Sequence, residues 1–472
     1  MSNPRIVAQM RDDWNARARE DAGYYVAFGR RGQDDAGFFA TASEVIRRLD
    51  AELRRFPSGE TLRLNALEIG CGPGRLMRPM SRHFAEVHGV DVSDEMIALA
   101  CEKLRDTPNA FPHVSNGASL EQFGDGSFGF VYSYAVFQHI PSREVVYQYL
   151  REIRRVLIPG GLAHLQFNGL PRDPISEGSY NTWTGARFSA EEILQFTRDN
   201  DFQMLALEGA STQYMWTTWR KRPMQQLALP AVPPTAVRRI TNASSSEPVA
   251  PCRGRFASIS LWVENLPEDA GLHDLQVFIG GSRGTVEHIG PPNRDGFQQV
   301  NVALPPMDAT GLLPVELLWR DKRISPVATL RVIPPGPLVP RLQSVCDAVN
   351  LVAENRIETR LVKMTLEEIS RPEEIRASID GRAVETSARV RHNRSLTVAA
   401  QPTLSGSQPL TEPRPSGSGQ TDELGLDYFC VDPRPQRYEV NFRLPEEIRS
   451  GIHTLEVSLG RRRIGGALLE VM

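Results

Sequence analysis

The hydrophobic positions follow different patterns in the two halves of the chain. Before about residue 222, short apolar runs alternate with stretches in which apolar residues recur every three or four positions, as in strands followed by amphipathic helices. After about residue 250, short runs of alternating apolar and polar residues lie between Gly and Pro. The pattern therefore predicts an α/β domain with a mainly parallel, doubly wound sheet, followed by all-β modules.

The first half is expected to begin with helices, within residues 7–56, and to continue with repeated strand and helix segments. Ser93 and Ser142 stand where N-caps are expected for the helices that follow them. The expected strands are 66–69, 87–92, 128–134, 162–167, 202–207 and 213–219, and the expected helices between them are 76–84, 94–104, 143–156 and 190–197.

An aromatic-rich stretch lies between the N-terminal helices. Such a stretch either packs helices together or covers a pocket as a lid, and the sequence leaves both roles open. Its aromatic residues are Tyr24, Tyr25, Phe28, Phe38 and Phe39.

A change of composition marks the end of the first domain. The stretch from Arg220 to Val249 is rich in Pro, basic residues and Ser and carries no sustained period, which predicts a linker at 223–249. The domain before it is expected at 1–222, with its core at 60–220 and a helical extension at its N-terminus.

An internal repeat predicts two β-sandwich modules, at 250–335 and 336–472. The segment VNVALP at 300–305 recurs as VNFRLP at 440–445. The second copy also carries an insertion at about 388–427, which is dense in Pro, Ser, Gly and Thr. Such a composition buries little apolar surface, so we expect this insertion to be mobile.

A glycine loop follows the first predicted strand. Gly70, Gly72 and Gly74 come directly after Ile69, and a helical pattern begins immediately afterwards. Glycine permits positive φ and lets a ligand lie against bare backbone, while the opening helix offers unpaired N–H groups. Asp91 follows about twenty positions later, where a doubly wound fold places a carboxylate on ribose hydroxyls. The two signals together predict a nucleotide-like ligand.

Charge and cysteine usage exclude several classes of protein. A net charge of −3 gives no global attraction to nucleic acid or anionic membranes. The chain has no apolar stretch long enough for a membrane span and no apolar signal region at its N-terminus, so we expect a soluble, cytoplasmic protein. The five cysteines are far apart, and no metal site is expected.

Three segments of the first half resemble the class I S-adenosylmethionine-dependent methyltransferases, which have a Rossmann-like fold. They are LEIGCGPGR at 67–75, GVDVS at 89–93 and RVLIPGG at 155–161. The resemblance covers roughly residues 60–170 and implies S-adenosyl-L-methionine as the cofactor. The Glu-x-Gly-x-Gly-x-Gly spacing favours this cofactor over the dinucleotide of an oxidoreductase.

The resemblance also implies a set of cofactor contacts. In the family the glycine loop packs against the methionine and ribose portions, so Asp91 would bind the ribose and Glu68 the aminoacyl end. Val92 and Met96 would lie near the adenine, and Asn116 and Ser119 stand in the segment at the adenine edge. The full predicted set is Glu68, Gly70, Cys71, Gly72, Gly74, Arg75, Asp91, Val92, Met96, Asn116, Gly117, Ala118 and Ser133.

Methyl transfer from a sulfonium is an in-line displacement, in which the enzyme mainly aligns the reacting atoms. His139, just after the fourth predicted strand, is either a base for a protonated acceptor or a loop histidine bonded to backbone. Tyr134, Tyr180 and Trp183 either line the acceptor pocket or cover the sheet.

The acceptor is expected to be a small molecule, sugar or peptide. No Asn-Pro-Pro-Tyr segment follows the fourth predicted strand, so DNA is not expected as the acceptor. The β modules resemble immunoglobulin-like sandwiches, which serve as spacers or bind a protein or glycan. The alternative to an enzyme is a cofactor-binding scaffold or recognition protein without catalysis.

Overall fold

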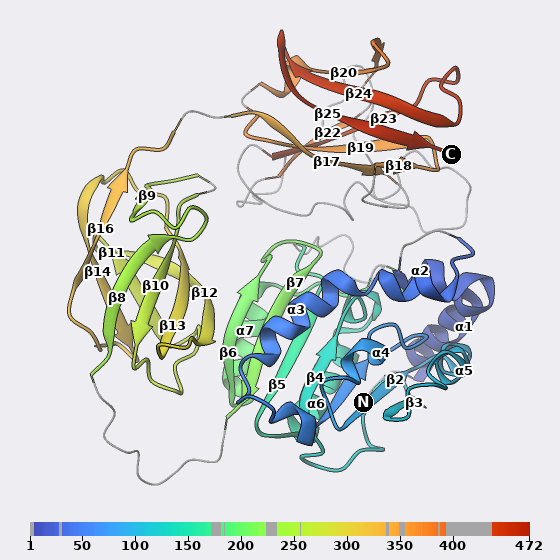
Figure 1. The fold of residues 1–472 in the computed structure, drawn as a ribbon, viewed down its shortest axis with the longest axis horizontal. Coiled ribbons are helices and arrows are strands. Elements are labelled where there is room, and N and C mark those ends of the chain that lie inside the picture. Colours follow the sequence, from blue (N-terminus) through green and yellow to red (C-terminus); the bar gives the residue numbers. More distant parts are fainter. Residues whose placement is uncertain are drawn as a thin grey trace. The chain divides into compact units, whose positions relative to one another are not determined.

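The structure is a computed structural model, and its described residues fall into two compact units (Figure 1). The first unit comprises residues 1–210 and 214–335, and the second comprises residues 211–213 and 336–472. The described residues are 4–27, 31–170, 181–183, 185–222, 234–254, 256–336, 339–348, 355–369, 371–385, 388–392 and 437–472.

A twisted sheet with strand order β3-β2-β1-β4-β5-β7-β6 forms the α/β part of the first unit. Its first five strands are parallel, and β7 and β6 add an antiparallel edge. Every residue of β4 is buried, as expected for a strand covered on both faces. The predicted doubly wound sheet is therefore confirmed. The strands are β1 (Asn65–Ile69), β2 (Glu86–Asp91), β3 (Ala110–Val114), β4 (Phe128–Ser133), β5 (Leu157–Phe167), β6 (Phe202–Glu208) and β7 (Met215–Lys221).

Helices cover both faces of this sheet. The core on one face includes α6 and α7, and the core on the other includes α3, α4 and α5. Ser93 and Ser142 cap α5 and α6 as predicted, since their hydroxyls accept from the backbone N–H groups of Met96 and Val145. The helices are α1 (Pro4–Ala27), α2 (Asp35–Ala40), α3 (Ser43–Leu53), α4 (Met77–Met80), α5 (Asp94–Lys103), α6 (Arg143–Val156) and α7 (Ala190–Asp199), with 3-10 turns η1 (Thr61–Arg63) and η2 (Phe137–His139).

The helix predicted at 76–84 is shorter than expected. Only α4 is α-helical there, and the chain continues in tighter turns in which Arg82 N–H donates to Pro79 O and His83 N–H donates to Met80 O. The i→i−4 bonds end with Ser81 N–H to Met77 O, after which the bonds are of the tighter i→i−3 type.

The predicted linker at 223–249 is wrong in its second half. Strand β8 (Ala236–Asn242) lies there and pairs with β10 (Ser258–Glu264). Arg238 and Arg239 are on β8, and the basic residues masked its strand pattern. Residues 223–233 lie outside the described residues.

The first β module continues from the α/β part within the same unit. Strand β12 (Ser282–Pro292) meets β6 through the pair His288 and Ala206. The amide of Gln203 donates to the carbonyls of Glu268 and Ala270, both at 2.8 Å. The module is therefore bonded to the antiparallel edge of the sheet. Its other strands are β9 (Val249–Pro251), β11 (Leu275–Ile279), β13 (Phe297–Ala303), β14 (Gly311–Trp319), β15 (Lys322–Arg323) and β16 (Ala328–Ile333).

The second unit repeats the strand pairing of the first module around its own core. The pairs β10–β13, β11–β14 and β14–β16 correspond to β19–β23, β20–β24 and β24–β25. Buried residues of both of its sheets form one hydrophobic cluster. The strands are β17 (Arg341–Asp347), β18 (Arg356–Ile357), β19 (Leu361–Glu367), β20 (Ile375–Ile379), β21 (Arg382–Val384), β22 (Ala388–His392), β23 (Arg437–Arg443), β24 (Gly451–Leu459) and β25 (Arg462–Val471), and the 3-10 turn is η3 (Pro372–Glu374).

The predicted insertion at about 388–427 begins too early, because its first five residues form β22, which pairs with β23. The rest of the insertion lies outside the described residues. Among the helices that the structure describes, none is both long and apolar enough to cross a membrane.

Replacing Arg55 with Ala should destabilise the first unit. Arg55 pairs with Glu52 at 2.6 Å, both side chains are at most 10% exposed, and Arg55 also donates to Ile289 O of β12. Arg55→Ala leaves the Glu52 carboxylate buried without its partner, which costs about 3 kcal/mol. A thermal scan should therefore show a fall of several degrees in Tm.

The exposed neighbour Arg54 provides the matched control. Arg54→Ala should leave Tm nearly unchanged, because it removes no buried partner. Equal effects of the two substitutions would contradict a stabilising role for the buried pair.

Candidate active site

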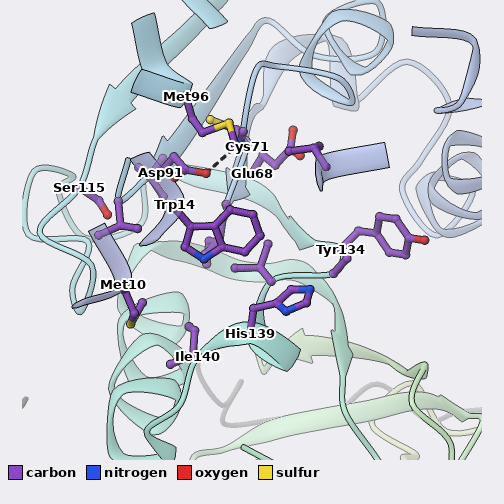
Figure 2. Close-up of a pocket in the computed structure, with 18 of the residues that line it drawn as sticks. Met10, Trp14, Glu68, Cys71, Asp91, Met96, Ser115, Tyr134, His139 and Ile140 are labelled. Atoms are coloured by element: carbon purple, nitrogen blue, oxygen red, sulfur yellow. Dashed lines mark hydrogen bonds between the residues drawn. The ribbon is translucent and has the colours of Figure 1, made fainter. Parts of the chain in front are cut away.

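A pocket opens where β1, β2 and β4 end, at the carboxyl edge of the parallel strands (Figure 2). Its lining comes from α1, from the glycine loop, from the end of β2 and from the segment that follows β4. Ten of the residues predicted from the sequence line it: Glu68, Gly70, Cys71, Gly72, Arg75, Asp91, Val92, Met96, Tyr134 and His139.

The glycines of the loop are required by packing as well as by backbone conformation. Gly70 has φ +71°, and a Cβ there would lie 2.2 Å from the Cγ2 of Val136. Gly74 has φ +81°, and a Cβ there would lie 2.6 Å from the Cδ1 of Leu104. Gly74 does not line the pocket, so its position is explained by close packing against α5.

Asp91 ties the glycine loop to the end of β2. Its Oδ2 accepts from Gly72 N–H at 3.0 Å, and its Oδ1 accepts from Ser93 N–H at 2.9 Å. Burial raises the pKa of the carboxyl, while the bonds from Ser93, Gly72 and Val92 act in the opposite direction. A carboxylate oxygen accepts more than one bond, so Asp91 retains acceptor capacity for a ligand hydroxyl.

Glu68 is buried at the end of β1 and accepts a bond from the Tyr132 hydroxyl at 3.1 Å. Burial raises the pKa of its carboxyl to about 8, against the lowering effects of Tyr132 and Arg75. Glu68 is therefore mostly protonated at neutral pH and becomes ionised when a cation lies beside it.

Arg75 presents an incompletely bonded guanidinium to the same pocket. Its Nη1 donates to Thr41 O at 3.1 Å, but its buried Nε has no hydrogen-bond partner among the described residues. Burial lowers the pKa of the group, and the Tyr134 and Glu68 side chains oppose this. A buried donor without an acceptor suits an incoming carboxylate.

Helix α1 closes one side of the pocket with Met10, Trp14, Tyr25 and Val26. Figure 2 shows the Trp14 indole in the middle of the lining residues. The Arg11 guanidinium fastens this helix to the rim, since its Nε donates to Val92 O and its Nη2 donates to Ser115 O, both at 3.2 Å.

The sequence left the aromatic stretch open between a lid and packing, and its residues divide between the two roles. Tyr25 lines the pocket, whereas Phe38 is buried in helix packing. Phe28 lies outside the described residues. The lining residues that sequence reasoning missed are Met10, Trp14, Val26, Ile69, Leu76, Val90, Ser115, Ala135, Val136, Ile140 and Tyr149.

Several predicted residues shape the surroundings of the pocket without lining it. Asn116 Oδ1 accepts from the N–H groups of Ala118 and Ser119 at 2.9 and 2.8 Å, so this side chain holds a turn. The Ser133 hydroxyl donates to Ile69 O at 3.0 Å. The predicted residues outside the lining are Gly74, Asn116, Gly117, Ala118, Ser133 and Trp183.

His139 lines the pocket, and both of its ring nitrogens are occupied. Nδ1 lies 2.8 Å from Trp183 O, and Nε2 lies 3.2 Å from the Gln138 side-chain nitrogen. Burial lowers the pKa of the imidazole to about 4. Trp183 packs on this ring at 5.3 Å between ring centroids, and Tyr180 lies outside the described residues.

Comparison with known proteins identifies the region that builds this pocket. Residues 67–165 match the family model described as a methyltransferase domain. Over 108 residues the chain is 36% identical to phosphoethanolamine N-methyltransferase 2 of Caenorhabditis elegans, covering 22% of this chain and 23% of that protein. Over 151 residues it is 28% identical to a ubiquinone biosynthesis O-methyltransferase of Sodalis glossinidius, covering 31% of this chain and 55% of that protein.

Among solved structures, the magnesium protoporphyrin IX methyltransferase of Synechocystis with bound SAH is similar with a TM-score of 0.34 at 18% identity. That likeness covers 45% of this chain and 97% of the other. The matches to the two curated relatives span about a quarter and about half of those proteins. Residues 67–165 are thus a methyltransferase domain.

Asp91→Ala should weaken the binding of S-adenosylhomocysteine at least tenfold. The substitution removes a charged acceptor from the pocket and releases the bonds from Gly72 and Ser93, and one bond to a charged group contributes about 1.5–3 kcal/mol. Isothermal titration calorimetry measures the change. Asp106→Asn, at an exposed position after α5, is the control and should bind normally. Unchanged affinity of Asp91→Ala would contradict the role of Asp91 as an acceptor for the ligand.

Glu68→Gln should change how stability depends on pH. The pKa of the Glu68 carboxyl is about 8 in the folded protein and near 4.5 when unfolded, so the folded state keeps the proton up to a higher pH. The wild type therefore loses stability as pH rises from about 5 to 8, and the uncharged glutamine removes this component. The difference in Tm between variant and wild type should grow in favour of the variant over that range. A constant difference would show that Glu68 is ionised throughout.

Proposed function

We propose that the protein transfers the methyl group of S-adenosylmethionine to a small acceptor by in-line displacement. The observation that carries the proposal is the set of buried polar groups in one pocket. Glu68, Arg75 and Asp91 all line it, and the unpaired Nε of Arg75 leaves a donor for a carboxylate. These groups suit the zwitterionic and hydroxyl-bearing parts of the cofactor.

The residues would divide the cofactor between them. Arg75 would hold its carboxylate, Glu68 its ammonium group and Asp91 its ribose hydroxyls. Val92 and Met96 offer an apolar wall for the adenine ring. The bound cofactor supplies an electrophilic methyl group, and the protein positions an acceptor in line with it.

The pocket lining also includes aromatic and apolar side chains. Trp14, Tyr25 and Tyr134 are among them with Ile140, and this lining favours an acceptor with an apolar or planar portion. Closure of the pocket by α1 would keep water from the reacting atoms. We therefore propose a small-molecule acceptor, with sugar and peptide acceptors as the other classes to be tested.

We further infer that the two β modules are immunoglobulin-like sandwiches with different roles. The bonds of Gln203 to the first module support a role as a brace for the sheet edge. The second module, with its own separate core, is the better candidate for binding a protein or glycan partner.

Incubation of the full chain with methyl-labelled S-adenosylmethionine and a fractionated cell extract should yield a labelled product, detected by mass analysis. S-adenosylhomocysteine should raise Tm, because it binds the folded state. Asp91→Ala, as the matched control, should abolish labelling.

Two outcomes would contradict the proposed activity. Stabilisation by nicotinamide dinucleotides and not by S-adenosylhomocysteine would indicate an oxidoreductase. Cofactor binding without a labelled product in any fraction would indicate a recognition protein that does not catalyse.

A further inference from the structure

Three buried side chains form a continuous chain of hydrogen bonds beside the pocket. Gln166, Gln138 and His139 are exposed by 0%, 2% and 6%. Gln166 Nε2 donates to Gln138 Oε1 at 2.9 Å, and Gln138 Nε2 lies 3.2 Å from His139 Nε2. This series of hydrogen bonds ends at Trp183 O, which lies 2.8 Å from His139 Nδ1.

Two backbone groups fix the orientation of Gln166. Ala135 N–H donates to its Oε1 at 2.9 Å, and its Nε2 donates to Phe167 O at 2.8 Å. A backbone N–H can only donate and a backbone carbonyl can only accept. Rotating this amide by half a turn would therefore place donor against donor and acceptor against acceptor.

The orientation of Gln166 determines that of Gln138, which in turn determines which nitrogen of His139 carries the hydrogen. Because Gln166 donates to Gln138 Oε1, Gln138 must turn its amino group towards His139. The Nε2 of His139 must then accept, so its hydrogen is on Nδ1, which donates to Trp183 O. The backbone groups at the two ends thus determine the tautomer of the imidazole.

We propose that His139 is a positioning residue that holds residues 181–183, the Trp183 segment, as a wall behind the lining of the acceptor site, and that it does not act as a base. This inference rests on the proposed methyl transfer for its functional part, whereas the tautomer follows from the structure alone. The lone pair of Nε2 is already used by Gln138. A proton on Nε2 would face the Gln138 amino group, and Gln138 cannot turn while Gln166 is fixed.

Backbone bonds reinforce the same attachment. Gly185 N–H donates to Gln138 O at 2.7 Å, and Ala186 N–H donates to Ile140 O at 2.9 Å. A Cβ at Gly185 would lie 2.6 Å from Ile140 N, so only glycine permits this approach. The hydrogen bond from His139 Nδ1 to Trp183 O adds a third contact between η2 and this segment.

Among the described residues, Arg17 is the cation that acts on His139, and the rings of Trp14 and Trp183 pack against it. The positive charge of Arg17 on α1 lowers the pKa of the His139 imidazole, as burial also does. The Trp14 and Trp183 rings lie at 5.5 and 5.3 Å between centroids. Arg17 stacks on both indoles, at 4.7 and 5.3 Å from their centres. The wall is therefore continuous from η2 through Trp183 to α1.

Histidine NMR on the 15N-labelled full chain tests the tautomer without any knowledge of the acceptor. His139 should show the neutral form protonated at Nδ1 from about pH 5.5 to 8. Assignment uses His139→Asn, which removes the signal. A hydrogen on Nε2, or titration of this imidazole between pH 6 and 7, would overturn the proposal.

Two substitutions then separate positioning from base catalysis, with the acceptor found by the labelling experiment. His139→Asn keeps a donor at the place of Nδ1, so kcat should fall less than about threefold. His139→Ala should raise KM for the acceptor at least tenfold and leave S-adenosylhomocysteine affinity unchanged. If His139 were the base, both variants would lose about 100-fold or more in kcat, which would overturn the proposal.

The outcomes also distinguish a failure of this inference from a failure of the proposed function. If the wild type methylates nothing, the NMR result still decides the tautomer. If it methylates an acceptor and both variants have unchanged KM and kcat, the Trp183 segment plays no part in acceptor binding, and the positioning role is wrong.

Discussion

The carboxylate of Asp91 is the contact on which the pocket most depends. It accepts from Gly72 N–H in the glycine loop and from Ser93 N–H at the N-cap of α5. One side chain thus holds both the loop after β1 and the start of α5 at the end of β2. Gly70 N–H and Cys71 N–H add bonds to Val90 O at 2.7 and 3.0 Å. The loop has three residues at positive φ and cannot form regular secondary structure. These bonds therefore replace the ladder that a strand would provide.

The pocket also concentrates ionisable groups that water would otherwise solvate. Glu68 and Arg75 are buried beside Asp91, and burying polar groups is costly unless partners compensate. The raised pKa of Glu68 favours its uncharged form, and the bond from Arg75 to Thr41 O satisfies one donor of the guanidinium, so both lower this cost. The remainder, above all the Nε of Arg75, is unmet within the described residues, as expected for a functional site completed by a ligand.

The features predicted correctly from the sequence are those that depend on residues close together in it. The strand ending at Ile69, the glycine loop, Asp91 and the Ser93 and Ser142 caps each depend on neighbours in sequence, and the structure has all of them. The lining by Met10 and Trp14 was missed, because their helical spacing reads the same whether they face a core or a pocket. The Pro, Ser and Arg content around β8 hid a strand that pairs with β10.

The same limit applies to the site. Gly74, Asn116 and Ser133 stand at family positions, yet their contacts are with Leu104, with their own turn and with Ile69 O. A motif shows which residue type is present but not whether it faces the ligand or the wall behind it. For His139 the deciding partners are Gln166 and Trp183, both distant in sequence. Helix α1 likewise joins distant segments, because Arg11 donates to Val92 O while Arg17 donates to Thr182 O.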